Sequence, residues 1–227
     1  MIIRHREMIE IGYSSGMEGV SIVTTCYNEL ENLELLISAI REVMSGFDLR
    51  HEIIVVDDSS PDGSYEVARK LADVAIQKKR EGQTKGLMTG IMAAMYSTII
   101  TIDSDLENEP RHIPKLLEAL KDYDVVVASR DRIPRVSERL FSWYYEGKLG
   151  VRDILSNFRA FEKRVAESII LKSGETYGAE FLIMAKAGGY RLGQIDVRRI
   201  RRARPRLGNN LTANLKIFVA FFRCLLL

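Results

Sequence analysis

The 227-residue chain contains little cysteine and little proline. Neither Cys26 nor Cys224 has a second cysteine or a histidine at metal-ligand spacing, which excludes a disulfide scaffold and a zinc finger. The chain has only five prolines and 16 glycines, and 46% of its residues are hydrophobic. This composition excludes a disordered or collagen-like chain. The scarcity of cysteine favours a reducing compartment.

Targeting and membrane-spanning patterns are also missing. Residues 1–12 mix basic and acidic side chains into their apolar stretches, so we expect no signal peptide. No uncharged apolar run reaches the length of about 18 residues that a membrane-spanning helix requires. Residues 1–19 resemble an extension ahead of the first regular element, and Met17 is an alternative to Met1 as the translation start.

Positive charge is concentrated near one end, although the formal net charge is only +2. Residues 191–206 hold seven arginines and one acid, a local charge of +6, which leaves −4 on the other 211 residues. A basic stretch of this kind favours an anionic partner. For Arg198, Arg199 and Arg201 we expect a solvated strand or attraction to anionic lipid headgroups.

An alternation of strand and helix patterns begins at Val20. Runs rich in β-branched residues predict strands, and apolar residues at helical spacing follow each run. This alternation is typical of an α/β protein with a parallel sheet. The expected strands are 20–25, 52–58, 74–77, 98–103 and 124–130, and the expected helices are 28–44, 65–72, 84–97 and 111–123.

After Arg130 the alternation stops, and we expect a mixed α+β half packed on the edge of the sheet. Helices are expected at 162–172 and 178–188, and a strand at 190–197. The aromatic and basic stretch 133–150 receives no assignment. No internal repeat or long linker marks a domain boundary.

Acidic side chains at the end of the strand 98–103 carry the strongest chemical signal. Asp103 and Asp105 flank Ser104, and Glu107 follows two residues later. Ligands of open α/β sheets bind at the carboxyl ends of strands, and carboxylate oxygens suit Mg²⁺ or Mn²⁺ that also grips a diphosphate. The pattern predicts a metal-assisted nucleotide site; a solvated turn is the alternative, because such tripeptides are common.

Two other strand ends carry candidate nucleotide ligands. Asp57, which stands beside Asp58, can accept hydrogen bonds from a base or ribose. Tyr27 can stack on a base, and Glu29 can bond the edge of that base. For Asn28, a helix N-cap is an equally good interpretation.

Five segments together resemble family 2 glycosyltransferases of the GT-A fold, especially dolichol-phosphate mannose synthases. They are VSIVTTCYNE, EIIVVDDSSPDG, GQTKGLMTGI, TIDSDLENEPRHIPKLLEAL and DVVVASR, in this order and spacing. The resemblance covers residues 20–227. It implies a Rossmann-like three-layer α/β/α sandwich with a mostly parallel sheet and a C-terminal amphipathic helix. The implied division has three parts: an N-terminal extension 1–19, a glycosyltransferase domain 20–210 and an interfacial helix 211–227. Within the domain, residues 20–130 would form a nucleotide-sugar half and residues 131–210 an acceptor half.

Carried over residue by residue, the resemblance implies four groups of functional residues. Nucleotide-sugar binding would fall to Tyr27, Glu29, Asp57, Lys85, Gly86, Asp103 and Ser104, and Mg²⁺ or Mn²⁺ binding to Asp103, Asp105 and Glu107. The catalytic residues would be Asp105, Arg130 and Asp153, and the acceptor phosphate would contact Arg139, Arg204 and Arg206. Departures from the mannose synthases occur at Glu107, where these often have Gln, at Ser156–Asn157, where Gly-Ser or Ser-Gly is common, and at Asn209–Asn210, where Ser-Lys is found.

The expected reaction is metal-dependent, inverting transfer of mannose from GDP-mannose to dolichyl or polyprenyl phosphate. A phosphate acceptor needs no protein base, because its second pKa is about 6. A hydroxyl acceptor would need a base, for which Asp153 is the candidate, but the arginines favour phosphate. The alternatives are glucosyl transfer from UDP-glucose and a non-catalytic module that binds RNA or a membrane.

Other nucleotide-dependent enzyme classes lack their motifs. The chain has no GxxxxGK[ST] loop and no GxGxxG, so a P-loop triphosphatase and a dinucleotide oxidoreductase are excluded. We expect the partners to be a nucleotide sugar, a polyprenyl phosphate and a membrane surface, and no nucleic acid.

Residues 211–227 predict peripheral attachment at the cytoplasmic face of a membrane. As a helix they would span about 25 Å, less than the hydrocarbon core of about 30 Å, with Phe and Leu side chains on a broad apolar face. A core helix or the beginning of a membrane segment are the alternatives. Trp143, Tyr144 and Tyr145, near Lys148, are a second candidate contact with the membrane, with burial in the core as the alternative.

Overall fold

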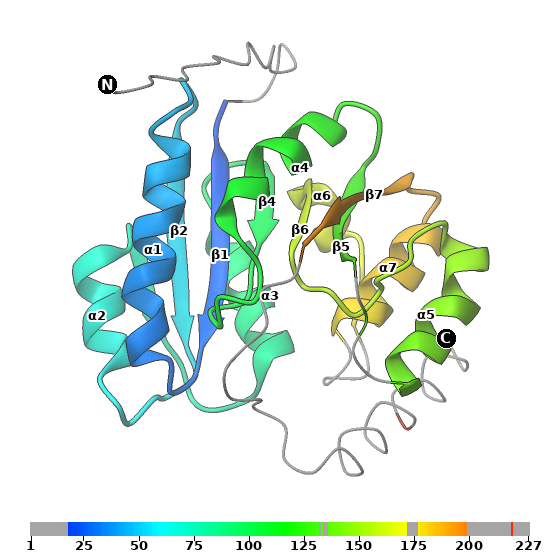
Figure 1. Cartoon of the computed structure of the whole chain (residues 1–227). Coiled ribbons are helices and arrows are strands. Elements are labelled where there is room, and N and C mark those ends of the chain that lie inside the picture. Colours follow the sequence, from blue (N-terminus) through cyan, green and yellow to red (C-terminus); the bar gives the residue numbers. More distant parts are fainter. Residues whose placement is uncertain (1–17, 132, 134–135, 172–176, 199–218, 220–227) are drawn as a thin grey trace, which may run out of the picture.

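A seven-stranded sheet forms the centre of the computed structural model, which describes residues 18–131, 133, 136–171, 177–198 and 219 (Figure 1). The strands stand in the order β3-β2-β1-β4-β6-β5-β7. Only β6 runs antiparallel to its neighbours, so the sheet is mostly parallel, as expected. The strands are β1 Val20–Cys26, β2 His51–Asp57, β3 Val74–Gln77, β4 Thr98–Thr101, β5 Val125–Arg130, β6 Arg159–Glu162 and β7 Leu192–Val197.

Helices cover both faces of the sheet. The helices α1, α2 and α4 bury apolar side chains against one face, and α3, α5, α6 and α7 bury theirs against the other. The predicted α/β fold is therefore confirmed. Their bounds are α1 Leu30–Met44, α2 Ser64–Leu71, α3 Gln83–Ala93, α4 Ile113–Ala119, which follows the 3₁₀ turn η1 Pro110–His112, α5 Val136–Leu149, α6 Lys163–Glu167 and α7 Tyr177–Ala187.

The strands supply side chains to two separate cores because successive residues point to opposite faces. In β2, Ile53 and Val55 belong to one cluster and Ile54 and Val56 to the other, and all four are fully buried. Burial on both faces explains why the strands are continuous apolar runs rather than alternating ones. It also leaves the strand ends as the place where polar side chains meet solvent.

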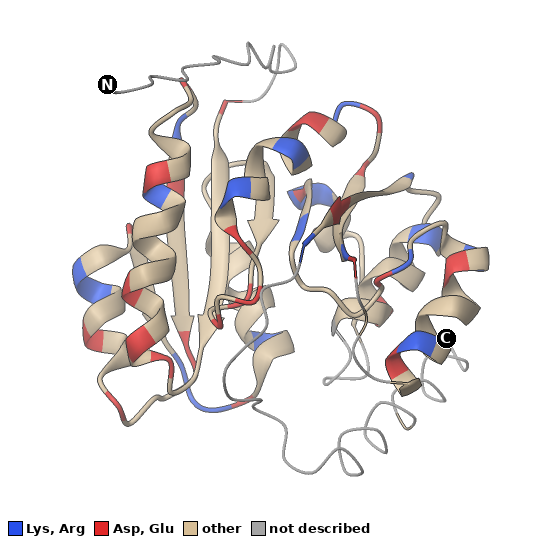
Figure 2. Ribbon diagram, viewed as in Figure 1, with Lys and Arg blue, Asp and Glu red and all other residues tan. Residues whose placement is uncertain are grey.

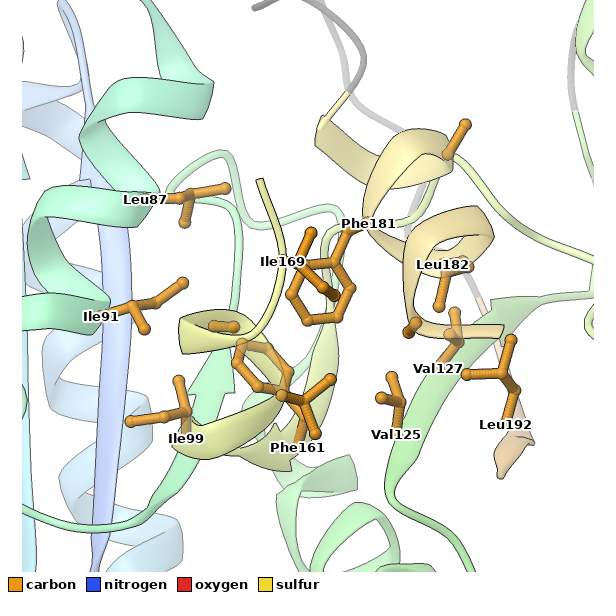
Figure 3. Close-up of a cluster of buried hydrophobic side chains, with 14 of the residues drawn as sticks. Leu87, Ile91, Ile99, Val125, Val127, Phe161, Ile169, Phe181, Leu182 and Leu192 are labelled. Atoms are coloured by element: carbon orange, nitrogen blue, oxygen red, sulfur yellow. The ribbon is translucent and has the colours of Figure 1, made fainter. Parts of the chain in front are cut away.

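The core on the α3 side joins the two halves of the described chain (Figure 3). Leu87 and Ile91 reach it from α3, while Phe181 reaches it from α7. The Phe161 and Phe181 rings pack with their centroids 4.8 Å apart. This shared core fixes α5, α6 and α7 against the sheet.

One unassigned stretch and one helix prediction after Arg130 differ from the structure. Residues 136–149, which received no assignment, form α5; exposed Leu140 and Trp143 conceal the helical spacing of its buried residues. Of the helix expected at 162–172, only Lys163–Glu167 is helical, with Ser168 as the C-cap residue. At Glu162, pairing in β6 opposite Thr98 replaces the local helix pattern.

Two glycines allow α3 to lie close to the sheet. A Cβ atom at Gly86 would stand 2.9 Å from Thr25 Cγ2, and one at Gly90 would overlap the Val23 side chain. Because these positions are adjacent turns of one helix, any larger residue would push α3 away from β1. The glycines therefore set the position of the helix start that borders the candidate site described below.

We expect Gly90→Ala to lower the free energy of unfolding by about 1–3 kcal/mol, because overpacking at a closed position forces neighbours apart. Urea denaturation measures this change. The matched control is Gly147→Ala on α5, where nothing lies within 4 Å of the added Cβ. That control should be neutral or stabilising, since alanine favours helix over glycine. Equal destabilisation of both variants would contradict the packing argument.

Candidate active site

The ends of β1, β2 and β4 and the start of α3 surround a cleft of about 110 Å³. In open α/β sheets, ligands bind at this end of the strands. Four residues predicted for nucleotide-sugar binding line the cleft, together with five others. The lining comprises Tyr27, Gly86, Asp103 and Ser104 from the prediction, and Thr25, Cys26, Asp58, Gly82 and Gln83.

Backbone strain occurs at the same edge of the sheet. Within the described part of the chain, three residues other than glycine have positive φ: Asn28 at 56°, Ser59 at 61° and Leu106 at 59°. They lie in the loops after β1, β2 and β4. Such conformations cost about 1 kcal/mol or more each and concentrate at functional sites. The strain therefore points to the edge that holds the cleft.

Asp103 is held in place by two side-chain amides. Gln83 Nε2 donates to its Oδ1 over 2.6 Å, and Asn157 Nδ2 donates to the same oxygen over 3.2 Å. Burial raises the pKa of the Asp103 carboxyl above its ordinary value, against the effect of both amides and of the Arg130 charge. In the described residues no hydrogen bond uses Oδ2, so this oxygen is available to a ligand.

Two other acids follow Asp103 in the loop after β4, and the charge of Glu107 contributes to raising the pKa of the Asp103 carboxyl. Asp105 Oδ1 accepts a hydrogen bond from the Glu107 backbone N–H over 3.1 Å and so shapes the loop. Among the described residues, no three acidic, histidine or cysteine side chains are grouped closely enough to hold a metal ion. The predicted metal set of Asp103, Asp105 and Glu107 stays a prediction. Its carboxylate oxygens are nevertheless the type of ligand that Mg²⁺ and Mn²⁺ prefer.

Ser104, which lines the cleft, has a buried hydroxyl without a hydrogen-bond partner in the described structure. Its side chain is 2% exposed, and its Oγ has no hydrogen-bond partner within the described structure. A buried hydroxyl normally has a partner, because leaving it unpaired costs about 1–3 kcal/mol. The hydroxyl of Ser104 is thus a candidate ligand contact.

The two acids of the second pair, Asp57 and Asp58, lie in different surroundings. Asp58 lines the cleft, whereas Asp57 is fully buried beside it. The Asp57 carboxylate accepts hydrogen bonds from the Ser60 backbone N–H over 2.9 Å and from the Cys26 thiol over 3.5 Å. Asp58 thus lies at the cleft wall, while the predicted contact of Asp57 with a nucleotide stays a prediction.

Asp58 also fixes the loop that borders the cleft. Its two carboxylate oxygens accept the backbone N–H groups of Glu81 and Gly82, each over 2.9 Å. Lys85, predicted to bind the nucleotide, is exposed and forms an ion pair with Glu81 over 2.7 Å. Lys85 does not belong to the cleft lining in the described structure.

An arginine that the sequence did not identify covers the predicted stacking residue. Arg80 Cζ lies 3.8 Å from the centroid of the Tyr27 ring, and Arg80 Nη1 donates to the Tyr27 hydroxyl over 2.9 Å. Nothing in the polar stretch KKREG distinguishes Arg80 from its neighbours. Its contact joins residues 53 positions apart, so only the fold reveals it.

Glu29 belongs to the start of α1 rather than to the cleft lining. It occupies the N-cap position, for which Asn28 was the candidate, and its carboxylate accepts a hydrogen bond from Asn32 Nδ2 over 2.5 Å. Its side chain is 3% exposed. The predicted contact of Glu29 with a nucleotide stays untested.

Arg130, at the end of β5, forms a buried ion pair with Asp153. The guanidinium Nε and Nη2 donate to the two carboxylate oxygens of Asp153, with the second bond 3.0 Å long, and the Arg130 backbone N–H donates as well. Burial disfavours the charged guanidinium, but the Asp153 hydrogen bonds and nearby acids raise the Arg130 pKa above its ordinary value.

The same pair encloses Asp153, the candidate base. This side chain is fully buried, and the Ser129 hydroxyl accepts its backbone N–H over 3.2 Å. A carboxylate enclosed in this way and bonded twice to a guanidinium is poorly placed to take a proton from a substrate hydroxyl. This geometry favours a positioning role toward Arg130, and the predicted catalytic role of Asp153 stays a prediction.

Of the predicted acceptor-phosphate ligands, Arg139 belongs to the described residues and is not in the cleft lining. Arg139 lies exposed on α5. Arg204 and Arg206 lie outside the described residues, as does the predicted helix 211–227 apart from residue 219. Among the described residues, no helix is both long and apolar enough to cross a membrane.

Sequence comparisons connect the chain with transferases that act on lipid phosphates. The model of the family "Glycosyl transferase family 2" matches residues 21–169. A dolichol-phosphate mannosyltransferase of Pyrococcus furiosus is 32% identical over 67% of this chain and 48% of its own length. An undecaprenyl-phosphate mannosyltransferase of Micrococcus luteus is 29% identical over 78% of this chain and 80% of its own. The chain thus spans about half the length of the first of these relatives.

Solved structures share the fold. Glucosyl-3-phosphoglycerate synthase from Mycobacterium tuberculosis, in complex with Mn²⁺, UDP and glucosyl-3-phosphoglycerate, matches with a TM-score of 0.74 at 21% identity over 97% of this chain and 86% of that one. Mannosyl-3-phosphoglycerate synthase from Rubrobacter xylanophilus matches with a TM-score of 0.74 at 19% identity, over 92% and 73%. At this identity the likeness shows the fold alone.

We expect Asp153→Asn to lower the free energy of unfolding by about 3–5 kcal/mol, because it leaves a buried guanidinium without its counter-charge. Urea denaturation measures the loss. Adding Arg130→Met should recover part of it, since neither charge then remains buried. The exposed control Arg139→Ala should change stability by less than about 0.5 kcal/mol. An Asp153→Asn protein as stable as the parent would contradict the positioning role.

Proposed function

The chain belongs to glycosyl transferase family 2, and on that premise we propose that it transfers a glycosyl group from a nucleoside diphosphate sugar to a polyprenyl phosphate. The observation that carries the proposal is the cleft at the strand ends, where Asp103 is fixed by amides from both halves of the described chain. The names of relatives from Pyrococcus furiosus and Micrococcus luteus support a lipid phosphate as acceptor.

The cleft offers the contacts that a nucleoside diphosphate requires. The Tyr27 ring can stack on the base, and the buried hydroxyl of Ser104 can bond to ribose or phosphate. Gly82 and Gly86 bring backbone rather than side chains to the wall of the cleft, which permits close approach of a ligand. We assign the donor to this cleft.

A divalent cation would be held by the carboxylates of Asp103 and Asp105, and Glu107 would complete the set. When bound, Mg²⁺ or Mn²⁺ supplies charge that stabilises the leaving diphosphate. The structural neighbours from Mycobacterium tuberculosis include complexes with Mn²⁺ or Mg²⁺ and UDP, which supports this choice of metal. The hydrogen bonds from Gln83 and Asn157 orient Asp103 while leaving Oδ2 for such a ligand.

We assign the acceptor phosphate to Arg130. Its guanidinium donates hydrogen bonds from Nε and Nη2 to Asp153, and within the described structure Nη1 makes no hydrogen bond. Those remaining N–H donors suit a phosphate oxygen, and Asp153 fixes the plane in which they point. The Arg130 charge also lowers the pKa of Asp103, so the two residues act within one electrostatic site.

The burial of Asp153 agrees with an acceptor that needs no base. A lipid monophosphate is largely ionised near neutral pH, since its second pKa is about 6. Its oxygen can therefore attack the anomeric carbon directly, on the side opposite the leaving diphosphate, and attack from that side inverts the configuration. Arg130 would hold this anion against the electrostatic repulsion of the donor diphosphate.

For the donor we propose GDP-mannose, with UDP-glucose as the alternative. We expect radiolabel from GDP-mannose to enter organic-extractable lipid when the protein is incubated with polyprenyl phosphate and Mn²⁺, and EDTA to abolish it. Label from UDP-glucose alone would establish the alternative donor. No label from either sugar, with nucleoside diphosphate still bound, would reject the lipid phosphate as acceptor.

Replacing both Asp103 and Asp105 with alanine should reduce this transfer at least about 100-fold, because the diphosphate loses its stabilising charge. The matched control is Asp122→Ala, which removes an exposed acid from the turn after α4 and should leave the rate unchanged. Full activity of the double variant would contradict the proposed metal and diphosphate site. Circular dichroism of each variant would establish that it is folded.

A further inference from the structure

Gln194, on β7, holds two neighbouring groups with one atom. Its Oε1 accepts hydrogen bonds from the Ser129 hydroxyl and from the Arg152 backbone N–H, each over 2.8 Å. A backbone N–H can only donate, so the oxygen of this amide, and not its nitrogen, must face Arg152. The Ser129 hydroxyl must then donate its own proton to the same oxygen. One side-chain carbonyl thus sets the direction of both hydrogen bonds.

The Ser129 hydroxyl extends this contact to Asp153. While its proton is donated to Gln194, its oxygen accepts the Asp153 backbone N–H over 3.2 Å. Ser129 and Asp153 are both fully buried. Residues 151–153 belong to no helix or strand. Side chains of β5 and β7, rather than a backbone ladder, therefore satisfy two successive N–H groups of this segment.

Gln194 and Ser129 form a polar contact between two strands whose other uncharged residues are apolar. The strands β5 and β7 pair in parallel, and each carries one charged residue near its carboxyl end (Figure 2). Arg152 Nη2 also donates to Asp196 Oδ1 over 2.6 Å. The Asp196 side chain is 69% exposed, and exposed ion pairs stabilise little. The contact with Gln194 is therefore the main attachment of the segment 152–153 to β7.

The position of Asp153 decides where Arg130 points. Asp153 accepts hydrogen bonds from Nε, Nη2 and the backbone N–H of Arg130. A planar guanidinium that is bonded through two nitrogens follows the plane of its carboxylate partner. If the backbone of residues 152–153 shifted, the carboxylate would move with it and turn the remaining N–H donors of Arg130. A change at Gln194 would therefore reach the acceptor site through Asp153.

From these contacts we infer that Gln194 is a positioning residue of the acceptor site, acting on Arg130 through the backbone of residues 152–153. The inference rests on the proposed function, which assigns the acceptor phosphate to Arg130. A residue that only braced the sheet would change stability. A positioning residue also changes how the enzyme binds the acceptor, and leaves binding of the donor as it was.

Gln194→Met tests the inference, since methionine has nearly the same length and volume but accepts no comparable hydrogen bond. We expect the KM for polyprenyl phosphate to rise about tenfold and the KM for the nucleotide sugar to stay within about twofold, because only the acceptor contact is misplaced. Gln194→Glu keeps an acceptor oxygen and should return the first KM to within about threefold of the parent value. The matched control, Gln77→Met, replaces an exposed glutamine at the end of the edge strand β3 and should change neither KM.

A second measurement reads Arg130 without requiring activity. In ¹⁵N NMR spectra, with Arg130→Lys used to assign the signal, the Nε–H of Arg130 reports whether its hydrogen bond to Asp153 persists. Hydrogen exchange at this N–H should be at least about tenfold faster in Gln194→Met, because the bond opens more often. Gln194→Glu and Gln77→Met should keep the exchange rate of the parent.

Three results would overturn the inference. They are a Gln194→Met protein with the acceptor KM and exchange rate of the parent, an equal rise in both KM values, and the same defect in Gln194→Glu as in Gln194→Met. Urea denaturation establishes that each variant is folded. A parent protein that transfers no sugar to polyprenyl phosphate would reject the proposed function instead, and the exchange rates alone would then decide whether Gln194 positions Arg130.

Discussion

The parallel pairing of β1, β2 and β4 is the constraint on which the candidate site depends. Parallel strands end at the same edge, so three loops distant in sequence meet there: the register pairs Cys26 with Asp57, and β4 lies on the other side of β1. Because both faces of the sheet are covered by helices, a ligand can approach these strands only from an edge. The cleft, the strained loops and the acid Asp103 all follow from that arrangement.

The antiparallel strand β6 joins the elements after Arg130 to this edge. It lies between β4 and β5, and the loop before it brings Asn157 to Asp103. The Asn157 carbonyl also accepts a hydrogen bond from the Thr101 hydroxyl over 2.6 Å. Further along the sheet, the buried pair of Arg130 and Asp153 fixes the end of β5. One sheet thus orients the residues assigned to donor and acceptor without a hinge between them.

The sequence predicted the strands and helices up to Arg130 well, because β1, β2, β4 and β5 are almost entirely buried and α1 has a clear apolar face. Helix α5 escaped prediction since its exposed side is as apolar as its buried side. Strand-end acids located the cleft, but the sequence could not show that Asp58 lines it while Asp57 is buried, because both carboxylates accept backbone N–H groups that only the fold brings to them. Gln83 and Asn157 act through long-range contacts that no local pattern encodes.

The arginine that stacks on Tyr27 has a consequence for turnover. A base that stacked on the face of the ring that Arg80 covers would first displace the guanidinium, so its net affinity would be a difference between two stacking contacts rather than the strength of one. The same competition acts on the spent nucleoside diphosphate after the sugar has left. Arg80 returning to the ring would speed product departure, and the loop anchored on Asp58 keeps that arginine within reach.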